Sequence, residues 1–391
     1  MKVAVVGQGY VGLPLAIAAA ESGYEVIGID NNQALISSLS DGISPIGDIS
    51  DAQVAKVIST DNYKVTTNFS EISSVDVVVV CVPTPLNSAH RPDLSYVESA
   101  FNEIAKYLAD GALVINESTV APGTTRSLIA RILEESGKTF DLAYSPERID
   151  PANKVWNVKN TPKLVAGLTE SATERAMKFY GAFVETITPG SSVEVIETAK
   201  LLENSFRLIN ISFINEIAQF CNALGIDARE VINAAATKPY GFMPFYPSAG
   251  VGGHCIPVDP MYLADKASEI GTPSKFIDLA HEINQGLPHY FATTASNLLD
   301  GLANKRILLV GVAYKPGVAD TRETPALGLI TALRDAGANV SWHDDLVLHW
   351  NNENSTALSD QFDLAILLNP HPHCDLTLLG QTPVLNTRGG N

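Results

Sequence analysis

Short runs of apolar, mostly β-branched residues alternate with helical stretches over the first 190 or so residues. These runs predict strands at 3–6, 25–29, 75–82, 112–116 and 141–144. The run Val77–Val80 is apolar at four successive positions, which is typical of a parallel strand buried on both faces. Because strands alternate with helices, the pattern predicts a doubly wound α/β domain, to which we assign residues 1–191.

The pattern changes near Ser192. Residues 193–224 contain neither glycine nor proline and predict one very long helix that ends at Gly225. Its apolar positions lie nearly all round the helix: Leu201, Leu202, Phe206, Ile209, Phe213, Ile214 and Ile217. Such a helix is expected to be buried, either between domains or at a subunit interface. Further helical segments follow to about Ala303, so residues 192–303 are predicted to form a helical middle domain that mediates dimerisation.

The last third of the chain repeats the logic of the first. A strand at 306–311 ends in glycine, a helix follows at 324–336, and a strand at 339–342 leads to two aspartates. A loop, 312–323, is inserted between the first strand and the helix. We therefore predict a second Rossmann-like domain over residues 304–391. The expected fold is α/β, with two Rossmann-like doubly wound parallel-sheet domains joined by the long central helix and the helical middle domain.

Composition narrows the class of protein. The chain has 391 residues, of which 46% are hydrophobic and 18% charged, and a formal net charge of −17. This charge argues against nucleic acid or an anionic membrane as a partner. Four widely spaced cysteines form no CxxC pair, no apolar run is long enough for a membrane helix, and a strand-like segment starts the chain. We expect reduced thiols in a soluble protein of the cytoplasm.

The segment GQGYVG at residues 7–12 follows a predicted strand and begins a predicted helix. Glycine at the first, third and last positions allows a tight turn and close approach of the backbone to a pyrophosphate. Asp30 ends the next strand and would accept hydrogen bonds from the adenosine ribose. No basic residue follows at 31–33, so NAD is favoured over NADP, and FAD is the main competitor.

Three further loops follow predicted strands, where ligands bind in a parallel α/β sheet. They are 82–85, 117–123 and 145–148, and they offer Thr84, Thr119 and Glu147 to a cofactor, a water or a substrate. Each loop taken alone is equally well explained as ordinary turn chemistry.

A cysteine stands in the glycine-rich segment GVGGHCIPVDP at 250–260, with Asp259 four residues after Cys255. A thiol in such a loop suggests a covalent nucleophile, although a free cysteine is often simply buried. On the long helix Lys200 and Asn204 are one turn apart and share a face. They would stabilise an oxyanion and lower the pKa of a nearby thiol, or else make an interdomain hydrogen bond.

Lys315 and Arg322 stand in the inserted loop of the C-terminal repeat. Cations there suggest a second phosphorylated ligand, and the alternative is a salt bridge to Asp320 or Glu323. The segment His371-Pro-His373-Cys374 lacks further ligands at suitable spacing, so we predict no metal site. Cys81 and Cys221 lie in apolar surroundings and are expected in the core.

Seven blocks spread over nearly the whole chain together resemble the UDP-glucose/GDP-mannose dehydrogenase family. They occur in the family's order: GQGYVG with Asp30, CVPTPL, ESTVAPGTT, YSPERIDPAN, AKLLENSFRLINISFINEIA, GVGGHCIPVDP and GVAYKPGVADTRETPA. The blocks SPERIDPAN and TKPYGFMPFYPSAGVGGHCIPVDPMYL are similar to the branch acting on UDP-N-acetylhexosamines. Val258 stands where the UDP-glucose branch usually carries lysine. The ending NTRGGN at 386–391 departs from the family's aspartate-containing DTRN-like pattern.

The resemblance implies an NAD-binding N-terminal domain, a central dimerisation region and a C-terminal domain that holds UDP. It also implies oxidation of a sugar C6 alcohol to a carboxylate with two NAD molecules. We further expect a homodimer, and the family suggests a role in the synthesis of polysaccharide or glycan precursors. The most favoured substrate is UDP-N-acetylglucosamine. Alternative substrates are UDP-glucose and UDP-N-acetylmannosamine. Alternative functions are a single-hydride β-hydroxyacid dehydrogenase and a nucleotide-binding scaffold without turnover.

We assign residue roles as a hypothesis that fits this chemistry. Cys255 would hold the intermediate as a thiohemiacetal and then a thioester. Lys200 and Asn204 would stabilise oxyanions, Asp259 would position or activate a water, and Glu147 with Thr119 would help deprotonate the hydrolytic water. The expected cofactor contacts are Gly7, Gly9, Tyr10, Val11, Gly12, Asp30, Thr84, Thr119 and Arg322. The expected substrate contacts are Glu147, Arg148, Lys200, Asn204, Tyr246, Gly252 and Lys315.

Overall fold

A computed structural model describes residues 1–47, 49–150 and 152–389. Pro151 of the SPERIDPAN block and the last two residues of the NTRGGN ending lie outside the described residues. The chain divides into two compact units, one of residues 1–202 and 261–270, the other of residues 203–260 and 271–391. The three-domain division expected from the sequence stays a prediction. Within the described ranges, none of the helices has the length and apolarity needed to cross a bilayer.

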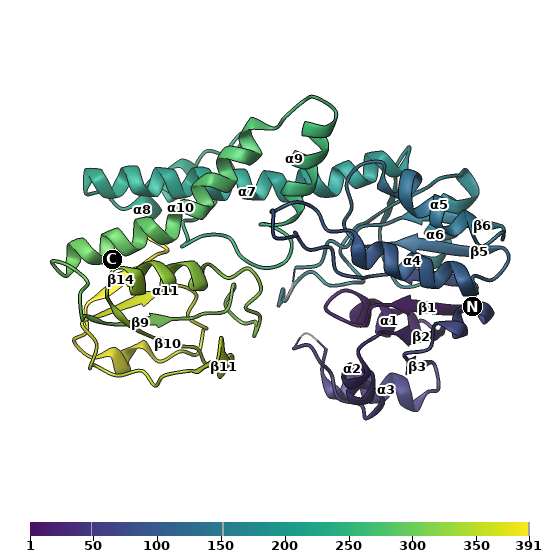
Figure 1. The fold of residues 1–391 in the computed structure, drawn as a ribbon, viewed down its shortest axis with the longest axis horizontal. Coiled ribbons are helices and arrows are strands. Elements are labelled where there is room, and N and C mark those ends of the chain that lie inside the picture. The colour runs from purple at the N-terminus through teal and green to yellow at the C-terminus, as the bar shows by residue number, and fades with distance from the viewer. Residues whose placement is uncertain (48, 151, 390–391) are drawn as a thin grey trace. The chain divides into compact units, whose positions relative to one another are not determined.

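An eight-stranded sheet forms the centre of the first unit (Figure 1). Its order is β3-β2-β1-β4-β5-β6-β7-β8, and all pairs are parallel except β6 with β7. The strands are β1 (Lys2–Val6), β2 (Glu25–Ile29), β3 (Tyr63–Thr66), β4 (Val77–Val80), β5 (Ala112–Asn116), β6 (Phe140–Tyr144), β7 (Lys163–Gly167) and β8 (Ile187–Pro189). Since β1 lies between β2 and β4, the order reverses at β1, and the loops after β1 and β4 lie at this switch point.

Helices cover both faces of this sheet, as alternate strand residues show. Val3, Val5, Val77 and Val79 pack with one set of helices, and the residues between them pack with another. The first set is α1 (Gly12–Glu21), α2 (Gln33–Ser40), α3 (Asp51–Ser59) and α6 (Glu170–Tyr180). The second is η1 (Phe69–Ser74), α4 (Ser95–Tyr107), η2 (Thr125–Ile129) and α5 (Ala130–Glu134). The doubly wound α/β prediction is therefore confirmed.

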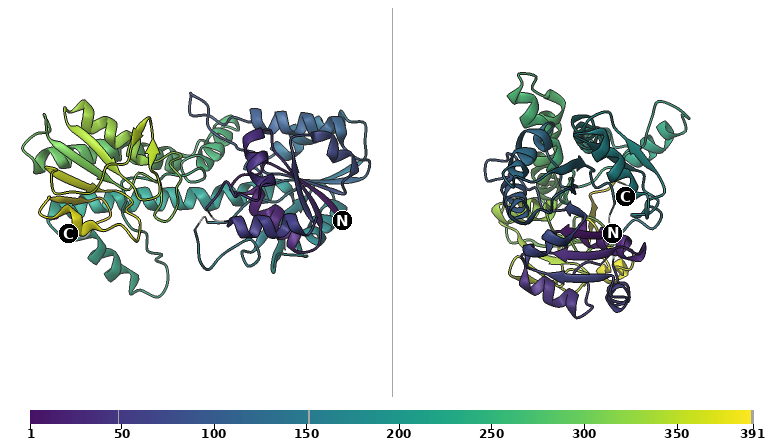
Figure 2. Two further views of the ribbon diagram at one scale, coloured as in Figure 1. Left: turned by 90° about the horizontal axis from the view of Figure 1, so that it is seen from below. Right: turned by 90° about the vertical axis from the view of Figure 1, so that its right-hand side faces the viewer.

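The second unit contains a four-stranded parallel sheet in the order β10-β9-β13-β14; Figure 2 gives two further views of both sheets. Its elements are β9 (Arg306–Val310), α11 (Pro325–Asp335), β10 (Asn339–His343), β13 (Leu364–Leu367), η3 (Leu376–Leu379) and β14 (Val384–Asn386), with a small hairpin of β11 (His349–Trp350) and β12 (Glu353–Asn354). Ile307 and Leu309 face α10 and α11, whereas Leu308 and Val310 face Leu379. The predicted second Rossmann-like domain is present.

Four helices form the helical middle of the chain: α7 (Val193–Leu224), α8 (Ala228–Ala236), α9 (Asp259–Glu269) and α10 (Lys275–Leu298). The bounds of α7 match the sequence prediction, and Gly225 follows it with φ of 70°. The helix is only partly buried within the chain, because one face of large apolar side chains is exposed: Leu202, Phe206, Phe213, Phe220 and Leu224.

Several strand predictions need correction at their ends. The predicted strand 75–82 is shorter, because Val75 closes the turn of η1 and Cys81 already belongs to the loop after β4. Strands β3, β7 and β8 were missed. Each is three to five residues long and has few fully buried positions, so the apolar signal is weak.

Helix α4 offers a matched test of the core. Phe101 is fully buried against the sheet, whereas Tyr96 on the same helix is half exposed. Phe101→Ala should lower the free energy of unfolding of this unit by about 3–5 kcal/mol because it leaves a cavity. Tyr96→Ala should change it by about 0.5 kcal/mol or less. Urea unfolding measures both, and equal losses would contradict the assigned burial.

Candidate active site

The glycine loop after β1 is shaped for close approach of a phosphate group. Gly7 has φ of 90°, and a Cβ on Gly12 would lie 1.8 Å from the Gly7 carbonyl oxygen. A Cβ on Gly9, in contrast, would meet no atom within 4 Å. Gly7 and Gly12 are therefore required by the turn itself, and Gly9 leaves open space in front of the N-terminus of α1. Tyr10 and Val11 complete the turn and are partly buried. This geometry fits a dinucleotide pyrophosphate.

Asp30 follows β2 and is only partly buried. Its Oδ2 accepts a hydrogen bond from the Gln8 backbone N–H at 2.9 Å, and its Oδ1 accepts one from the Asn32 N–H at 2.9 Å. These bonds fix the carboxylate beside the glycine loop, and each oxygen keeps acceptor capacity for a ribose hydroxyl. Binding of the adenosine ribose by Asp30 stays a prediction.

The loops after β4 and β5 are tied to each other and to α7. The Ser118 hydroxyl donates to the Val82 carbonyl at 2.8 Å and accepts from the Val82 N–H at 3.0 Å. Glu197 on α7 accepts the N–H groups of Gly123 at 2.6 Å and Thr125 at 2.9 Å. Sequence reasoning missed Glu197, whose buried carboxylate fixes the second loop.

Two of the predicted polar residues lie in these loops. Thr84 is buried and Thr119 is partly buried, at the carboxyl ends of neighbouring strands β4 and β5. Ligands bind at this edge of parallel α/β sheets, and contact of either threonine with a ligand stays a prediction.

The loop after β6 carries Glu147 and Arg148. Lys200 on α7 donates from Nζ to the Glu147 carbonyl oxygen at 2.6 Å. The Glu147 carboxylate accepts the Arg148 N–H, and the Arg148 guanidinium donates to the Pro162 carbonyl at 2.7 Å. The structure thus brings Lys200, Glu147 and Arg148 together. It also gives Arg148 a bond to the backbone, and the substrate contact expected of this residue stays a prediction.

A buried ion pair behind these loops was missed by sequence reasoning. Nζ of Lys163 lies 2.9 Å from Oε1 of Glu117 in the core, and the Tyr180 hydroxyl donates to the same carboxylate. Burial alone would lower the pKa of Lys163, but the carboxylates of Glu117 and Glu147 outweigh burial and raise it. Lys163 is therefore a charged ammonium. The signal was hidden because each residue stands alone in an apolar segment.

Cys81 and Cys221 both pack in apolar surroundings, as predicted. The pKa of Cys81 is raised by burial and by the neighbouring Glu117. Cys81 is consequently a protonated thiol, unsuited to nucleophilic attack.

Cys255, unlike Cys81 and Cys221, is exposed. Its carbonyl oxygen accepts the N–H groups of Val258 at 3.3 Å and Asp259 at 2.8 Å, where α9 begins. The Asp259 carboxylate is fully buried and accepts a hydrogen bond from Nδ2 of Asn204 at 2.6 Å. Asn204, Asp259 and Cys255 therefore form one connected group in the second unit. The alternative of a buried Cys255 is wrong, and its role as nucleophile stays a prediction.

Backbone conformation and close packing explain why glycine is required in the cysteine loop. Gly253 has φ of 83°, and its N–H donates to the Arg322 carbonyl at 2.9 Å. A Cβ on Gly252 would lie 2.7 Å from the Glu323 carbonyl oxygen and 2.8 Å from Tyr314 Cβ. The cysteine loop therefore packs directly on the inserted loop 312–323. Asn284 of α10, which the sequence analysis missed, accepts the Val251 N–H at 2.8 Å.

The inserted loop carries the two predicted cations. The Arg322 guanidinium forms a bidentate salt bridge with Asp320, the shortest N–O distance being 2.7 Å. This is the alternative that the sequence left open, although the Arg322 side chain remains 47% exposed. Lys315 is partly buried in the same loop.

An aspartate–histidine pair anchors this loop. Asp344 Oδ2 accepts the Val312 N–H at 2.9 Å, and Oδ1 lies 2.8 Å from Nε2 of His371. Nδ1 of His371 accepts the Gly317 N–H at 2.8 Å. His371, which the sequence analysis weighed only as part of a metal motif, instead holds the backbone of the loop.

Tyr246 lies in the aromatic segment before the cysteine loop and is exposed. Its hydroxyl donates to Asn233 at 3.2 Å, and the Arg229 guanidinium lies 5.3 Å from its ring centroid. The geometry leaves the aromatic ring accessible, as a substrate contact requires.

Taken by units, the first carries a dinucleotide-type loop with Asp30 and a cluster of Lys200 with Glu147. The second carries an exposed cysteine whose backbone carbonyl binds the N–H of Asp259, the carboxylate member of a buried amide–carboxylate pair. These groups suit hydride transfer to a nicotinamide and covalent catalysis by a thiol.

Comparisons with known proteins identify the family to which the chain belongs. Family models of the UDP-glucose/GDP-mannose dehydrogenase family match residues 1–184 as the NAD binding domain, 194–286 as the central domain and 308–380 as the UDP binding domain. A UDP-N-acetyl-D-mannosamine dehydrogenase of Pyrococcus horikoshii is 34% identical over 95% of this chain and 90% of its own. A UDP-N-acetyl-D-glucosamine 6-dehydrogenase of Pseudomonas aeruginosa is 37% identical over 89% of this chain and 83% of its own.

Solved structures are also similar. The structure of the Pyrococcus horikoshii UDP-D-ManNAc dehydrogenase has a TM-score of 0.90 and 33% identity, covering 99% of this chain and 95% of that one. A UDP-glucose dehydrogenase of Pyrobaculum islandicum has a TM-score of 0.92 and 25% identity, covering 99% and 94%. With its glycine loop, its cysteine loop and all three family models in order, the chain belongs to the UDP-glucose/GDP-mannose dehydrogenase family and is an NAD-dependent UDP-sugar dehydrogenase.

Proposed function

We propose that this enzyme oxidises the C6 alcohol of a UDP-N-acetylhexosamine to a carboxylate, with UDP-N-acetylglucosamine as the preferred substrate. The observation that carries the four-electron reaction is the exposed Cys255 thiol, held by a glycine loop beside Asn204 and Asp259. A dehydrogenase that stops at the aldehyde has no use for such a thiol. The single-hydride alternative and the scaffold without turnover are accordingly disfavoured.

The residues of the glycine loop and Asp30 fit NAD as the cofactor. Gly9 leaves room for the pyrophosphate and Asp30 offers acceptor oxygens to the ribose. NAD supplies the hydride acceptor for each of the two oxidations. Residues Tyr10, Val11, Thr84 and Thr119 surround the same edge of the sheet and are proposed to complete the binding site.

Cys255 prevents loss of the aldehyde formed by the first oxidation. Its thiolate adds to the C6 carbonyl carbon, and the resulting thiohemiacetal oxygen takes up a proton. This adduct again has a C6–H bond, so C6 can give a second hydride to NAD while the hydroxyl loses its proton to solvent, which leaves a thioester. Water then attacks the thioester carbonyl, the C–S bond breaks, and the thiol is regenerated together with the carboxylate.

The neighbouring groups handle charge and protons. Lys200 and Asn204 lie one turn apart on α7, and we assign their N–H groups to the oxyanions that develop at C6. Asp259, hydrogen-bonded to Asn204, is assigned to positioning water. Glu147 with Thr119 is assigned to deprotonating the hydrolytic water. Arg148, Tyr246, Gly252 and Lys315 are proposed substrate contacts, and Arg322 a cofactor contact.

The choice of sugar has support on two sides. The UDP-N-acetyl-D-glucosamine 6-dehydrogenase relative shares 37% identity with this chain. The UDP-N-acetyl-D-mannosamine dehydrogenase relative shares 34% but over more of the chain. UDP-N-acetylmannosamine is therefore the second candidate, and the two epimers differ only in the orientation at C2.

We also propose a homodimer formed through α7. Phe206, Phe213 and Phe220 recur every seven residues, so they lie along one face of the helix, and all three are exposed within the chain. An apolar face of this size favours a second copy as its cover.

All four cysteines are free thiols, which suits a protein of the reducing cytoplasm. We propose that the enzyme acts there and supplies precursors for polysaccharide synthesis.

The substrate proposal is tested with a panel of UDP-sugars. Purified enzyme with NAD should release two NADH per UDP-N-acetylglucosamine, with a kcat/KM about tenfold or more above those for UDP-N-acetylmannosamine and UDP-glucose. NADH absorbance and mass spectrometry of the product measure both quantities. Preference for the manno epimer would overturn the choice of sugar, and one NADH per sugar would overturn the four-electron reaction.

Replacement of the nucleophile tests the covalent intermediate. Cys255→Ser should reduce uronate formation by about 1000-fold or more, because the hydroxyl is a much weaker nucleophile than a thiolate. Cys221→Ala, which changes a cysteine buried on α7, is the matched control and should retain activity. Near-normal uronate production by the serine variant would exclude covalent catalysis by Cys255.

A charge on the exposed face of α7 tests the dimer. Phe213→Glu should shift the sedimentation coefficient from that of a dimer to that of a monomer, since it would bury an unpaired carboxylate. Leu348→Glu changes an equally exposed apolar residue away from α7 and should leave the dimer intact. Identical sedimentation of both variants and the wild type would reject this interface.

A further inference from the structure

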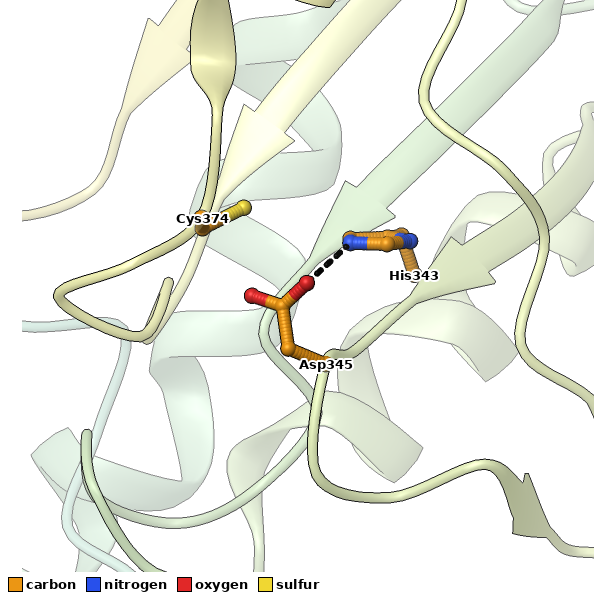
Figure 3. Close-up of side chains that lie close together, drawn as sticks. All are labelled: His343, Asp345 and Cys374. Carbon is orange, nitrogen blue, oxygen red and sulfur yellow. Dashed lines mark hydrogen bonds and ion pairs between the residues drawn. The ribbon is translucent and has the colours of Figure 1, made fainter.

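Three side chains outside the proposed active site gather in the second unit. His343 ends β10, Asp345 follows it, and Cys374 lies in the segment after β13 (Figure 3). Their ligand atoms all lie within 4.8 Å of one another. Since β10 and β13 flank β9, two segments from either side of β9 meet at the carboxyl edge of the sheet. The HPHC motif contributes only its cysteine to this cluster, because His371 is engaged by Asp344.

The hydrogen bonds of His343 identify its protonated nitrogen. Nδ1 lies 2.8 Å from the Thr356 carbonyl oxygen, which can only accept, so Nδ1 carries a hydrogen. Nε2 lies 3.2 Å from Oδ1 of Asp345. In a neutral imidazole with the hydrogen on Nδ1, Nε2 presents a lone pair to a carboxylate oxygen. Two such acceptors face each other stably only when a proton or a metal ion lies between them.

The distances and donor types suit a metal ion. Bonds of about 2.0 Å from a tetrahedral zinc ion to nitrogen and oxygen separate the two donor atoms by about 3.3 Å, close to the 3.2 Å between His343 and Asp345. Imidazole, thiolate and carboxylate are the three ligand types that zinc takes in proteins. The bond from Nδ1 to the Thr356 carbonyl is the outer contact that orients most metal-binding histidines.

The local charge also favours a cation. The pKa of the Cys374 thiol is raised to about 11, first by burial and then by Asp345, Asp344 and Asp375. The same negative potential would be neutralised by a divalent ion, which would convert the thiol to a thiolate ligand.

We propose that His343, Asp345 and Cys374 form a site for a single zinc ion that cross-links the end of β10 to the segment after β13. On binding, the Zn–S bond forms, the thiol proton passes to solvent, and a water fills the fourth coordination position. Asp344, between two of the ligands in sequence, holds the start of the inserted loop through Val312. The metal would therefore stiffen the edge of the sheet that supports Lys315 and Arg322.

Cobalt substitution tests the site directly. Untagged full-length protein should bind one Co²⁺ with the near-ultraviolet charge-transfer band of a cobalt–thiolate bond. Cys374→Ser should abolish this band, and His343→Gln should weaken Co²⁺ binding about tenfold or more.

Two controls separate this site from other thiols and histidines. His373→Gln removes an exposed histidine next to Cys374 in sequence and should leave Co²⁺ binding unchanged. Cys255→Ser should leave the charge-transfer band unchanged. A band that is lost with Cys255 and retained in Cys374→Ser would overturn the proposal, as would the absence of Co²⁺ binding to correctly folded wild type. The cluster would then be an ion pair of an imidazolium with Asp345.

Discussion

The buried hydrogen bond between Asn204 and Asp259 is the constraint on which the proposed active site depends. It joins the middle of α7 to the first residue of α9, and the Asp259 N–H in turn binds the Cys255 carbonyl. A buried carboxylate without this amide would carry a desolvation cost of several kcal/mol. The cysteine loop is consequently held between a helix and the inserted loop 312–323, so that an exposed thiol is presented from a rigid backbone.

In both Rossmann-like sheets an aspartate accepts a backbone N–H of the loop after the first strand, but the two aspartates have different roles. In the first unit Asp30 accepts the N–H of the residue after Gly7, and in the second Asp344 accepts the N–H of the residue after Gly311, each at 2.9 Å. Asp30 is partly exposed and keeps acceptor capacity toward a ligand. Asp344 is buried and is saturated by backbone N–H groups and His371. In the second sheet the aspartate therefore anchors a loop that bears cationic side chains, and it does not serve as an acceptor for a ribose.

Features with a local physical cause could be predicted from the sequence. The bounds of α7 follow from its lack of glycine and proline, and the glycine loop with Asp30 follows from the turn geometry of a parallel α/β sheet. Partners distant in sequence could not be predicted. Lys163 and Glu117 are 46 positions apart and Glu197 binds a loop more than 70 residues earlier, so only the folded chain brings them together. The glycine-rich segment suggested Cys255 as a nucleophile, the family resemblance supported this role, and the structure explains how the loop is held.

In the proposed reaction, Cys255 holds the partly oxidised C6 carbon within reach of the nicotinamide. The most direct measurement is a crystal structure of the wild-type enzyme with NADH and UDP-N-acetylglucosamine, a pair that binds without reacting. We expect Sγ of Cys255 to lie about 3–3.5 Å from C6, with C6 also facing C4 of the nicotinamide. A complex in which C6 points away from the sulfur, toward solvent or another side chain, would contradict it.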